Sequence, residues 1–397
     1  MQIQKNINDF LIPDWQSEKH WEVDINRGKP LFAEYSLGPY FYTPEKKKYI
    51  DFLMGWGSII IGHADKGIQE VIFAEAQKGL IFNSHHPVEI QLASTLKGFY
   101  PFEVHVGYFL NGSDAVSAAV RIARAATGKE GVLFSGYHGW HDWSQPFAKG
   151  VPIFVKDFSQ KISIETQEQT LDIIHAKLNN LACLVFEVPL ASSFSVPFFQ
   201  YIKKLSVENN FLIIFDEIKS GIRLGFTPGV NLYKIYPDMV IYGKAFSGGL
   251  PLSLLLIDTK YANITSGTAL AATYWGYPLA IHVAEHIINR FRKENLLDTL
   301  QENSSYFFSQ LSRIFQDQGI DFRFEGPSAM PVFVTGENNF LIQTFYQRCF
   351  QLGLYFRRPG KNWFVSTSHT QQVLDESLEK FEMAIKKTKK NIPMRRL

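Results

Sequence analysis

The sequence FLIIFDEIKSG at residues 211–221, together with DMVIYGKAFSGGLP at residues 238–251, decides the fold. Each part begins with a short continuous apolar run, which predicts a strand covered on both faces. Asp216 follows the first run directly, and Lys244 follows the second after a single glycine. In an open parallel sheet, the carboxyl ends of the strands line the ligand crevice. We therefore expect a carboxylate and an amine to face one bound molecule, and the amine can form a Schiff base.

Length and composition limit the class of protein. The 397 residues predict two or three packed units, and the formal net charge of +2 gives no basic field for nucleic acid. The basic residues near the carboxyl terminus are typical of a solvated tail. Two cysteines exclude a disulfide framework and fit a reducing compartment. Because no segment has the features of a secretion signal or a membrane span, we expect a cytoplasmic protein without membrane or nucleic-acid partners.

A second informative segment is FLNGSDAVSAAVRIARAATG at residues 109–128. Its small apolar residues recur at helical spacing, and Gly128 is a suitable carboxyl-terminal stop. Gly112 and Ser113 stand at the start of this helix, where free backbone N–H groups, the positive helix end and a hydroxyl can hold a phosphate. The same residues also suit an ordinary helix cap.

Two patterns superficially resemble other kinds of binding site, one for a dinucleotide and one for a metal, but their spacing is wrong for both. The glycines at residues 55–62 lack the GxGxxG spacing of a dinucleotide loop, and no strand directly precedes them. The histidine pairs, His85 with His86 and His138 with His141, have no further ligand at metal-binding spacing. We therefore predict neither a dinucleotide site nor a metal site.

The remaining patterns predict the elements around these motifs. Residues 38–52 favour a short hairpin, residues 65–80 a helix, and residues 280–315 a pair of helical segments. Residues 364–387 favour a strand, a turn and a final amphipathic helix.

DEIKSG followed by YGKAFSGGLP resembles the paired signature of class III aminotransferases, which are fold type I enzymes that use pyridoxal phosphate. The sequence looks closest to glutamate-1-semialdehyde 2,1-aminomutases and their relatives, and five motifs occur in the right order between about residues 30 and 385. The resemblance implies an α/β fold, with a large domain built on a mostly parallel seven-stranded sheet between helices, and a smaller α+β domain. We expect an amino-terminal arm at residues 1–50, the large cofactor domain at 51–285 and the small domain at 286–397.

The resemblance also assigns roles in binding pyridoxal phosphate. Asp216 would pair with the pyridine nitrogen, which makes the ring an electron sink, and Lys244 would hold the cofactor through an imine and act in catalysis. Tyr137, in the segment SGYHGWHDW, would stack on one ring face, and Ile218 would cover the other.

Further cofactor contacts are implied by three shorter motifs. NGSDA resembles the phosphate cradle of the family, which assigns Gly112 and Ser113 to the cofactor phosphate. Glu187, after the apolar run at 181–186, would support the cofactor ring. Thr273, in ALAATYWGYPLA, matches a threonine that reaches the phosphate held by a partner subunit, so a homodimer with shared active sites is implied.

Substrate contacts are less well defined by the resemblance. Trp56, in MGWGSII, occupies the position of a tryptophan that lines the substrate pocket of some aminomutases, and a buried core tryptophan is the alternative. Lys219 stands where many relatives carry glutamine near the phenolic oxygen of the cofactor, and it either stabilises the phenolate or points away. Arg357 and Arg358 suit a substrate carboxylate or an exposed surface.

The resemblance implies an aminotransferase that moves an amino group from an amino-acid donor to a small carbonyl acceptor by a ping-pong mechanism. An intramolecular aminomutase of the glutamate-1-semialdehyde type is the alternative, favoured by Trp56 and opposed by Lys219. The same residues would also serve a decarboxylase or a racemase. A protein that binds pyridoxal phosphate without turnover would have no evident need for a lysine that moves protons.

Overall fold

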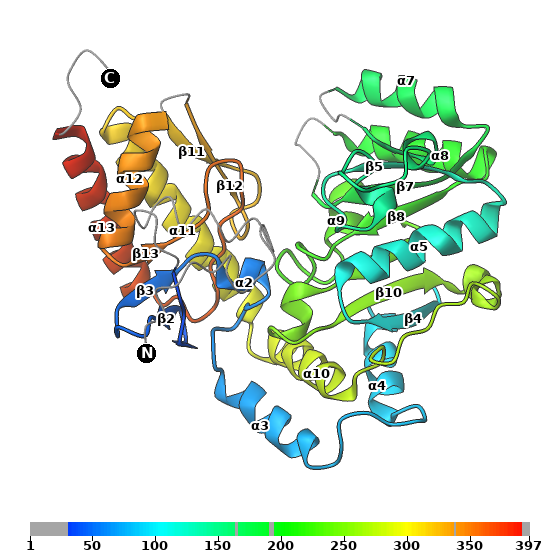
Figure 1. Cartoon of the computed structure of the whole chain (residues 1–397), viewed down its shortest axis with the longest axis horizontal. Coiled ribbons are helices and arrows are strands. Elements are labelled where there is room, and N and C mark those ends of the chain that lie inside the picture. Colours follow the sequence, from blue (N-terminus) through cyan, green and yellow to red (C-terminus); the bar gives the residue numbers. More distant parts are fainter. Residues whose placement is uncertain (1–30, 163–165, 190–193, 337–338, 391–397) are drawn as a thin grey trace. The chain divides into compact units, whose positions relative to one another are not determined.

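A computed structural model describes residues 31–162, 166–189, 194–336 and 339–390 (Figure 1). The chain folds into two compact units. The large unit is Gly67–Leu297, and the small unit combines the described residues up to Lys66 with those from Asp298 onward. The domain boundaries predicted after residues 50 and 285 stay predictions, because compactness alone does not identify a segment that folds independently.

A seven-stranded sheet forms the centre of the large unit, in the order β4-β10-β9-β8-β7-β5-β6. Strands β5 to β9 pair in parallel, whereas β10 pairs antiparallel with both β4 and β9. The predicted α/β fold with a mostly parallel seven-stranded sheet is therefore confirmed. The strands are β4 (Val104–Phe109), β5 (Gly131–Ser135), β6 (Ser159–Lys161), β7 (Leu181–Glu187), β8 (Leu212–Asp216), β9 (Met239–Tyr242) and β10 (Ser253–Asp258).

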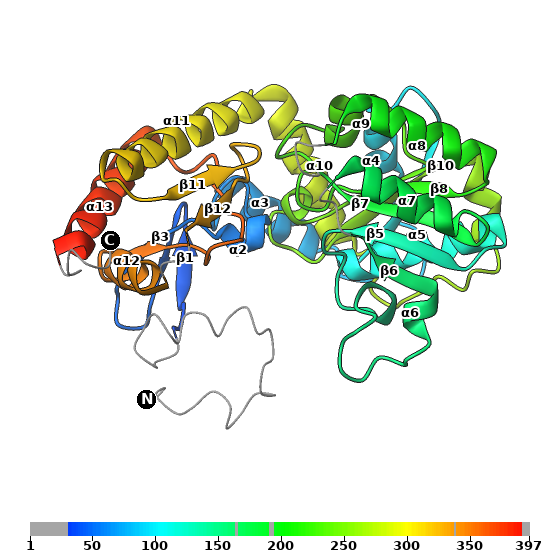
Figure 2. The ribbon, with the colours of Figure 1, turned by 90° about the horizontal axis from the view of Figure 1, so that it is seen from above.

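Helices cover both faces of this sheet, as the second view makes visible (Figure 2). On one face, the small residues of α5 (Gly112–Thr127) pack with Ile214 of β8 in a buried apolar cluster. On the other face, Phe215 lies against Phe199 of α8 (Val196–Glu208) and Tyr233 of α9 (Pro228–Tyr233). Alternate residues of β8 thus bury against opposite layers, which explains its continuous apolar sequence.

Other helices complete the large unit, and α10 packs beside α4. Within the described part of the chain, none of the helices is both long and apolar enough to cross a membrane. The remaining helices are α3 (Lys66–Ala76), α4 (Pro87–Lys97), α6 (Val155–Phe158), α7 (Gln167–Lys177) and α10 (Pro278–Lys293), with 3₁₀ turns at Asp142–Ser144, Lys244–Ser247 and Thr259–Thr265.

The small unit is an α+β structure with an aromatic core. Phe52 stacks on Phe307 and lies near Trp363 and Phe381. The predicted hairpin and final helix are confirmed. The strand expected near residue 364 is wrong, because that buried segment makes single backbone hydrogen bonds, such as the one from the N–H of Phe364 to the carbonyl of Phe52 at 2.8 Å, and no continuous ladder. The elements are β1 (Tyr35–Leu37), β2 (Tyr40–Tyr42), β3 (Lys48–Asp51), β11 (Phe322–Glu325), β12 (Val332–Thr335), β13 (Leu354–Tyr355), α11 (Leu296–Asp317), α12 (Asn339–Gln351) and α13 (Gln371–Lys390).

The glycine-rich segment of the small unit forms a left-handed turn, α2 (Met54–Gly57). Met54 and Trp56 have φ values of 46° and 54°, which are costly for residues with a Cβ atom. Asp51 stabilises the turn: its Oδ1 accepts two consecutive backbone N–H groups at 2.7 and 2.9 Å, and its Oδ2 lies 2.9 Å from Nε2 of His63.

Both cysteines are buried and unpaired. Cys183 lies within β7 in the large unit, and Cys349 lies within α12 in the small unit. Burial raises the pKa of Cys183 to about 12 and raises the pKa of Cys349 as well. Both thiols are therefore protonated at neutral pH.

Candidate active site

Five of the predicted site residues lie at or just beyond the end of the large sheet where strands β5, β7, β8 and β9 finish. We call this carboxyl end of the strands the sheet edge. Asp216 is the last residue of β8, and Glu187 is the last residue of β7, directly opposite it in the parallel register. Lys244 follows β9 after one glycine, and Tyr137 follows β5 after one glycine. Ser113 lies at the start of α5, shortly after β4. The edge thus combines an amine, two carboxylates, a hydroxyl and an aromatic ring.

Asp216 is 3% exposed and is held in place by two hydrogen bonds. Its Oδ1 accepts the backbone N–H of Ile218 at 3.0 Å, and its Oδ2 lies 2.7 Å from Nδ1 of the buried His138. The other ring nitrogen of His138, Nε2, lies 2.7 Å from the carbonyl oxygen of Ser135. Because a carbonyl can only accept, Nε2 donates this hydrogen bond, and a proton between Nδ1 and the Asp216 carboxyl group makes the other.

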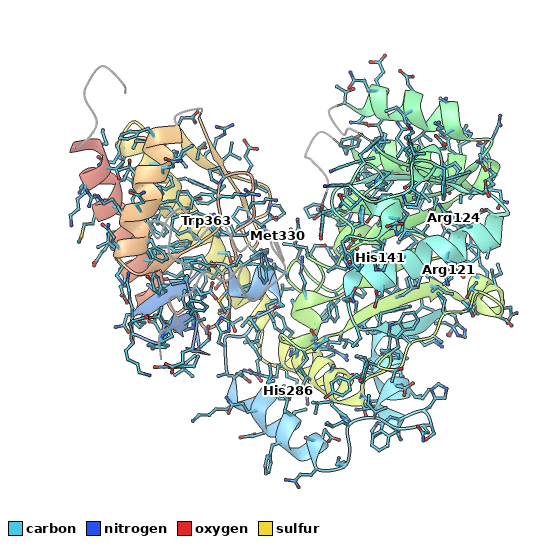
Figure 3. The ribbon with its side chains drawn as sticks, viewed as in Figure 1. Arg121, Arg124, His141, His286, Met330 and Trp363 are labelled. Atoms are coloured by element: carbon cyan, nitrogen blue, oxygen red, sulfur yellow. The ribbon has the colours of Figure 1, made fainter. Side chains whose placement is uncertain are left out.

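His138 was missed as a site residue from the sequence. Sequence reasoning considered it only with His141 as a metal pair, but the two side chains have different partners. Nδ1 of His141 lies 2.7 Å from Oγ of Ser117 on α5, and its Nε2 lies 3.5 Å from Oδ1 of Asp114. Figure 3 shows His141 beside α5. Among the described residues, no group of three or more potential ligands could hold a metal ion.

Lys244 opens a short 3₁₀ turn in a left-handed backbone conformation, with a φ of 46°. Such a conformation costs roughly 1–2 kcal/mol for a residue with a side chain. Strain of this kind often accompanies functional residues, because the surrounding fold must impose it. Here it fixes where the amine-bearing side chain leaves the backbone.

The start of α5 is surrounded closely by two other segments. A Cβ atom at Gly112 would lie 2.4 Å from Cδ1 of Ile218, and one at Gly139 would lie 2.0 Å from Oγ of Ser113. Asn111 caps the helix by accepting the N–H of residue 114 at 3.0 Å. The first N–H groups of a helix have no partner inside it, so this end can bind an anion.

Glu187 connects two of the loops at this edge. Its Oε2 accepts the backbone N–H of Tyr137 at 3.0 Å, and its Oε1 forms an ion pair with Nζ of Lys219. Burial alone would raise the pKa of Glu187, but Lys219, His138 and the N–H of Tyr137 outweigh burial and lower it. The Tyr137 side chain itself is 64% exposed.

Glu217 lies next to Asp216 but in a different environment. It is fully buried, its Oε1 accepts the backbone N–H of Gly229 at 2.8 Å, and its Oε2 has no hydrogen-bond partner among the described residues. Burial raises the pKa of Glu217 to about 8. The buried Glu217 carboxyl group therefore favours its protonated form at neutral pH.

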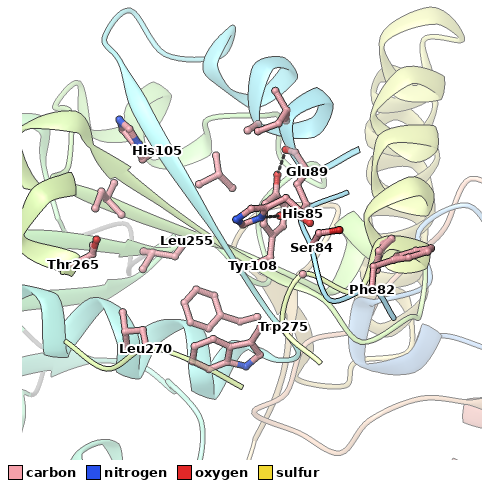
Figure 4. Close-up of a pocket in the computed structure, with 18 of the residues that line it drawn as sticks. Phe82, Ser84, His85, Glu89, His105, Tyr108, Leu255, Thr265, Leu270 and Trp275 are labelled. Carbon is pink, nitrogen blue, oxygen red and sulfur yellow. Dashed lines mark hydrogen bonds and ion pairs between the residues drawn. The ribbon is translucent and has the colours of Figure 1, made fainter. Parts of the chain in front are cut away.

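Thr273 lines a separate pocket of about 760 Å³ in the large unit. Figure 4 shows His85, Glu89 and Tyr108 close together in this pocket. The pocket also contains His85, whose Nδ1 lies 2.9 Å from Oε2 of Glu89, and Tyr108, whose hydroxyl donates to the carbonyl of Glu89 at 2.5 Å. Among the predicted site residues that the structure describes, Thr273 alone lines this pocket. Trp56 belongs to the small unit, and its role stays a prediction.

Known proteins resemble this chain in sequence and in fold. Residues 24–388 match the family described as aminotransferase class-III. Glutamate-1-semialdehyde 2,1-aminomutase of Aquifex aeolicus (strain VF5) is 28% identical over 394 residues, which cover 90% of this chain and 93% of that protein. 3-Aminobutyryl-CoA aminotransferase of Cloacimonas acidaminovorans (strain Evry) is 24% identical over 374 residues, which cover 91% of this chain and 90% of that protein.

A solved structure gives independent support for the fold. The FumI protein of Sphingopyxis sp. MTA144, in its PLP internal aldimine form, superposes with a TM-score of 0.85 at 22% identity, covering 91% of this chain and 89% of that one. The family match spans most of the chain, and the seven-stranded sheet agrees with it. The chain therefore belongs to the class III aminotransferase family of enzymes.

Proposed function

We propose that this enzyme binds pyridoxal phosphate and transfers an amino group from an amino-acid donor to a small carbonyl acceptor in a ping-pong cycle. One observation carries the proposal. A buried aspartate held by histidine, a lysine on a strained backbone and a helix start suited to an anion all lie at the same sheet edge. Membership of the class III aminotransferase family supports the same conclusion.

The donor groups at this edge fit the polar parts of pyridoxal phosphate. Asp216 offers a carboxylate to a ring nitrogen, and Lys244 offers an amine to an aldehyde. The N–H groups and hydroxyl at Gly112 and Ser113 offer hydrogen bonds to a phosphate. When bound, the cofactor supplies an electron-withdrawing ring that stabilises negative charge on the substrate carbon beside the nitrogen.

The protein side chains would divide the remaining work. His138 would keep the Asp216 carboxylate oriented, so that its negative charge stabilises a protonated ring nitrogen. Tyr137 and Ile218 would cover the two faces of the ring, and Glu187 would hold the loop of Tyr137. Nζ of Lys244 would anchor the cofactor, then take a proton from the substrate carbon and return it.

We also propose a homodimer, in which Thr273 completes the phosphate site of the second copy. The pocket around Thr273 supports this part of the proposal, because large apolar side chains there, including those of Ile81, Phe82 and Ile90, are exposed. Sedimentation analysis tests it: a monomer at micromolar concentration with full activity would contradict a shared site.

Two smaller parts of the proposal concern the substrate and the compartment. Trp56 would line the substrate pocket. The two buried, unpaired cysteines support the predicted cytoplasmic location.

An intramolecular aminomutase is the second candidate function. The 28% identity to a glutamate-1-semialdehyde aminomutase over nearly the whole chain favours it. In that case, one carbon skeleton would both donate and receive the amino group, and the same lysine would serve both half-reactions.

Single-donor experiments separate these candidates. Purified enzyme loaded with pyridoxal phosphate would be mixed with one amino donor at a time, while visible absorbance and released pyridoxamine phosphate are measured. Stoichiometric pyridoxamine phosphate from a donor such as glutamate supports transfer, whereas isomerisation of a single amino-aldehyde supports the mutase. Failure with every donor contradicts an aminotransferase. Lys244→Ala is the control, and a variant that kept the visible band through dialysis would overturn the assignment of Lys244.

A further inference from the structure

We propose that Lys219 is a positioning residue of this site. Through Glu187, it ties the turn after β8 to the loop after β5, and it balances the negative charge that Glu187 places beside Asp216. The turn after β8 carries Asp216 and Ile218, and the loop after β5 carries Tyr137. This inference rests on the proposed function for its catalytic meaning, while the ionic connection itself belongs to the fold.

The first connection between the two loops runs through Glu187. Lys219 follows Asp216 by three residues, and its Nζ contacts Oε1 of Glu187. The opposite oxygen, Oε2, accepts the N–H of Tyr137 at 3.0 Å. Gly136 allows this approach, because a Cβ atom there would lie 2.4 Å from the same oxygen. The carboxylate therefore uses one oxygen for each loop.

The second connection joins the same two loops by a different pair. His138, one residue after Tyr137, holds Asp216 through the 2.7 Å contact between Nδ1 and Oδ2. This pair is buried, whereas Lys219 and Glu187 are partly exposed, at 22% and 21% of their side-chain surface. The turn after β8 and the loop after β5 are therefore joined twice, once by each pair.

Charge balance gives Lys219 a second effect. Glu187 and Asp216 are paired residues on adjacent parallel strands, and such strands lie about 4.8 Å apart. Two carboxylates carried by neighbouring residues of this kind repel each other in a partly buried site. His138 contacts one carboxylate and Lys219 contacts the other. Removing the ammonium group would leave an uncompensated negative charge next to the groups that bind the cofactor.

A series of Lys219 variants tests this role. In Lys219→Met, the uncompensated negative charge of Glu187 is expected to raise the pH midpoint of the visible absorbance of bound pyridoxal phosphate by roughly half a unit. Cofactor affinity is expected to fall about tenfold. Glu187→Gln combined with Lys219→Met should return the midpoint toward that of the wild type, and Lys219→Arg should preserve both properties.

A double-mutant cycle on the cofactor-free protein provides a readout independent of activity. The destabilisation from Lys219→Met and Glu187→Gln should be strongly non-additive in urea unfolding. Lys204 and Glu208 are a matched exposed pair, with side chains 69% and 51% accessible, and the corresponding cycle there should be additive.

The outcomes distinguish this inference from the proposed function. Additive effects at Lys219 and Glu187, or an unchanged midpoint in Lys219→Met, would overturn the role of Lys219. If the wild type bound no pyridoxal phosphate, the proposed function would fail, but the unfolding cycle would still decide whether Lys219 acts through Glu187. A Lys219→Arg variant as impaired as Lys219→Met would also contradict a role that depends on positive charge.

Discussion

Replacing Glu217 with glutamine should make the stability of the protein less dependent on pH. Glu217 is fully buried, with one oxygen bound to the N–H of Gly229 and a pKa raised to about 8 by burial. Glutamine has the same shape and can accept the same hydrogen bond. The substitution therefore removes the titration and leaves the packing unchanged.

The sign and size of this pH dependence follow from proton binding to Glu217 in the folded and unfolded states. Between pH 4.5 and about 8, the folded protein keeps the proton of Glu217 while the unfolded chain loses it, so stability falls as pH rises. At 1.36 kcal/mol per pH unit, the full rise in pKa corresponds to about 5 kcal/mol. From pH 5 to pH 7 alone, the wild type should lose ~2.7 kcal/mol relative to Glu217→Gln.

Thermal unfolding of the cofactor-free proteins measures this difference. For a unit of this size, ~2.7 kcal/mol corresponds to roughly 5–10 °C in Tm, so the variant should gain that much on the wild type between pH 5 and pH 7. Glu208→Gln, at an exposed position, is the control and should shift little. A Tm difference between wild type and Glu217→Gln that stays constant over this range would refute the reasoning.

Three further predictions concern the sheet edge. His138→Phe should destabilise the protein by about 3–5 kcal/mol in urea unfolding, because Asp216 loses a buried partner. Adding Asp216→Asn should restore part of this stability, and a double variant as unstable as His138→Phe would contradict the reasoning. Lys244→Gly should be more stable than Lys244→Ala by about 1 kcal/mol, the reverse of the usual order, because only glycine relieves the left-handed backbone, and equal stability would argue against strain. Gly139→Ala should weaken pyridoxal phosphate binding at least tenfold through its clash with Ser113, measured by fluorescence titration, whereas Gly150→Ala, with a similar φ and open space, should bind normally.

Much of the large unit could be predicted from the sequence, because its central strands are buried on both faces. Continuous apolar runs before Asp216 and Lys244 identify such strands, and the rule for parallel sheets brings their ends together. The small residues after Ser113 likewise indicate a helix packed closely on a sheet. These features depend on local patterns, which a sequence displays directly.

Other features depend on contacts between distant residues or on strain. His138 and Asp216 are 78 residues apart, and nothing in their spacing selects this pair from the other polar residues at the edge. Met54 and Trp56 disfavour the left-handed conformation that they adopt, so local preference predicts the wrong backbone. The strand expected near Phe364 is wrong because an apolar run indicates burial, whereas a strand also needs a continuous ladder of backbone hydrogen bonds, which this segment does not form.

The burial of both thiols also makes this protein suitable for site-specific labelling. The sequence contains two cysteines, one in each unit, and both are inaccessible and protonated at neutral pH. Reagents that modify thiols should therefore leave the folded wild type unlabelled. Arg313→Cys on α11 and Lys204→Cys on α8 would introduce one exposed thiol in each unit, and a fluorophore pair there would report any change in their separation when a ligand binds.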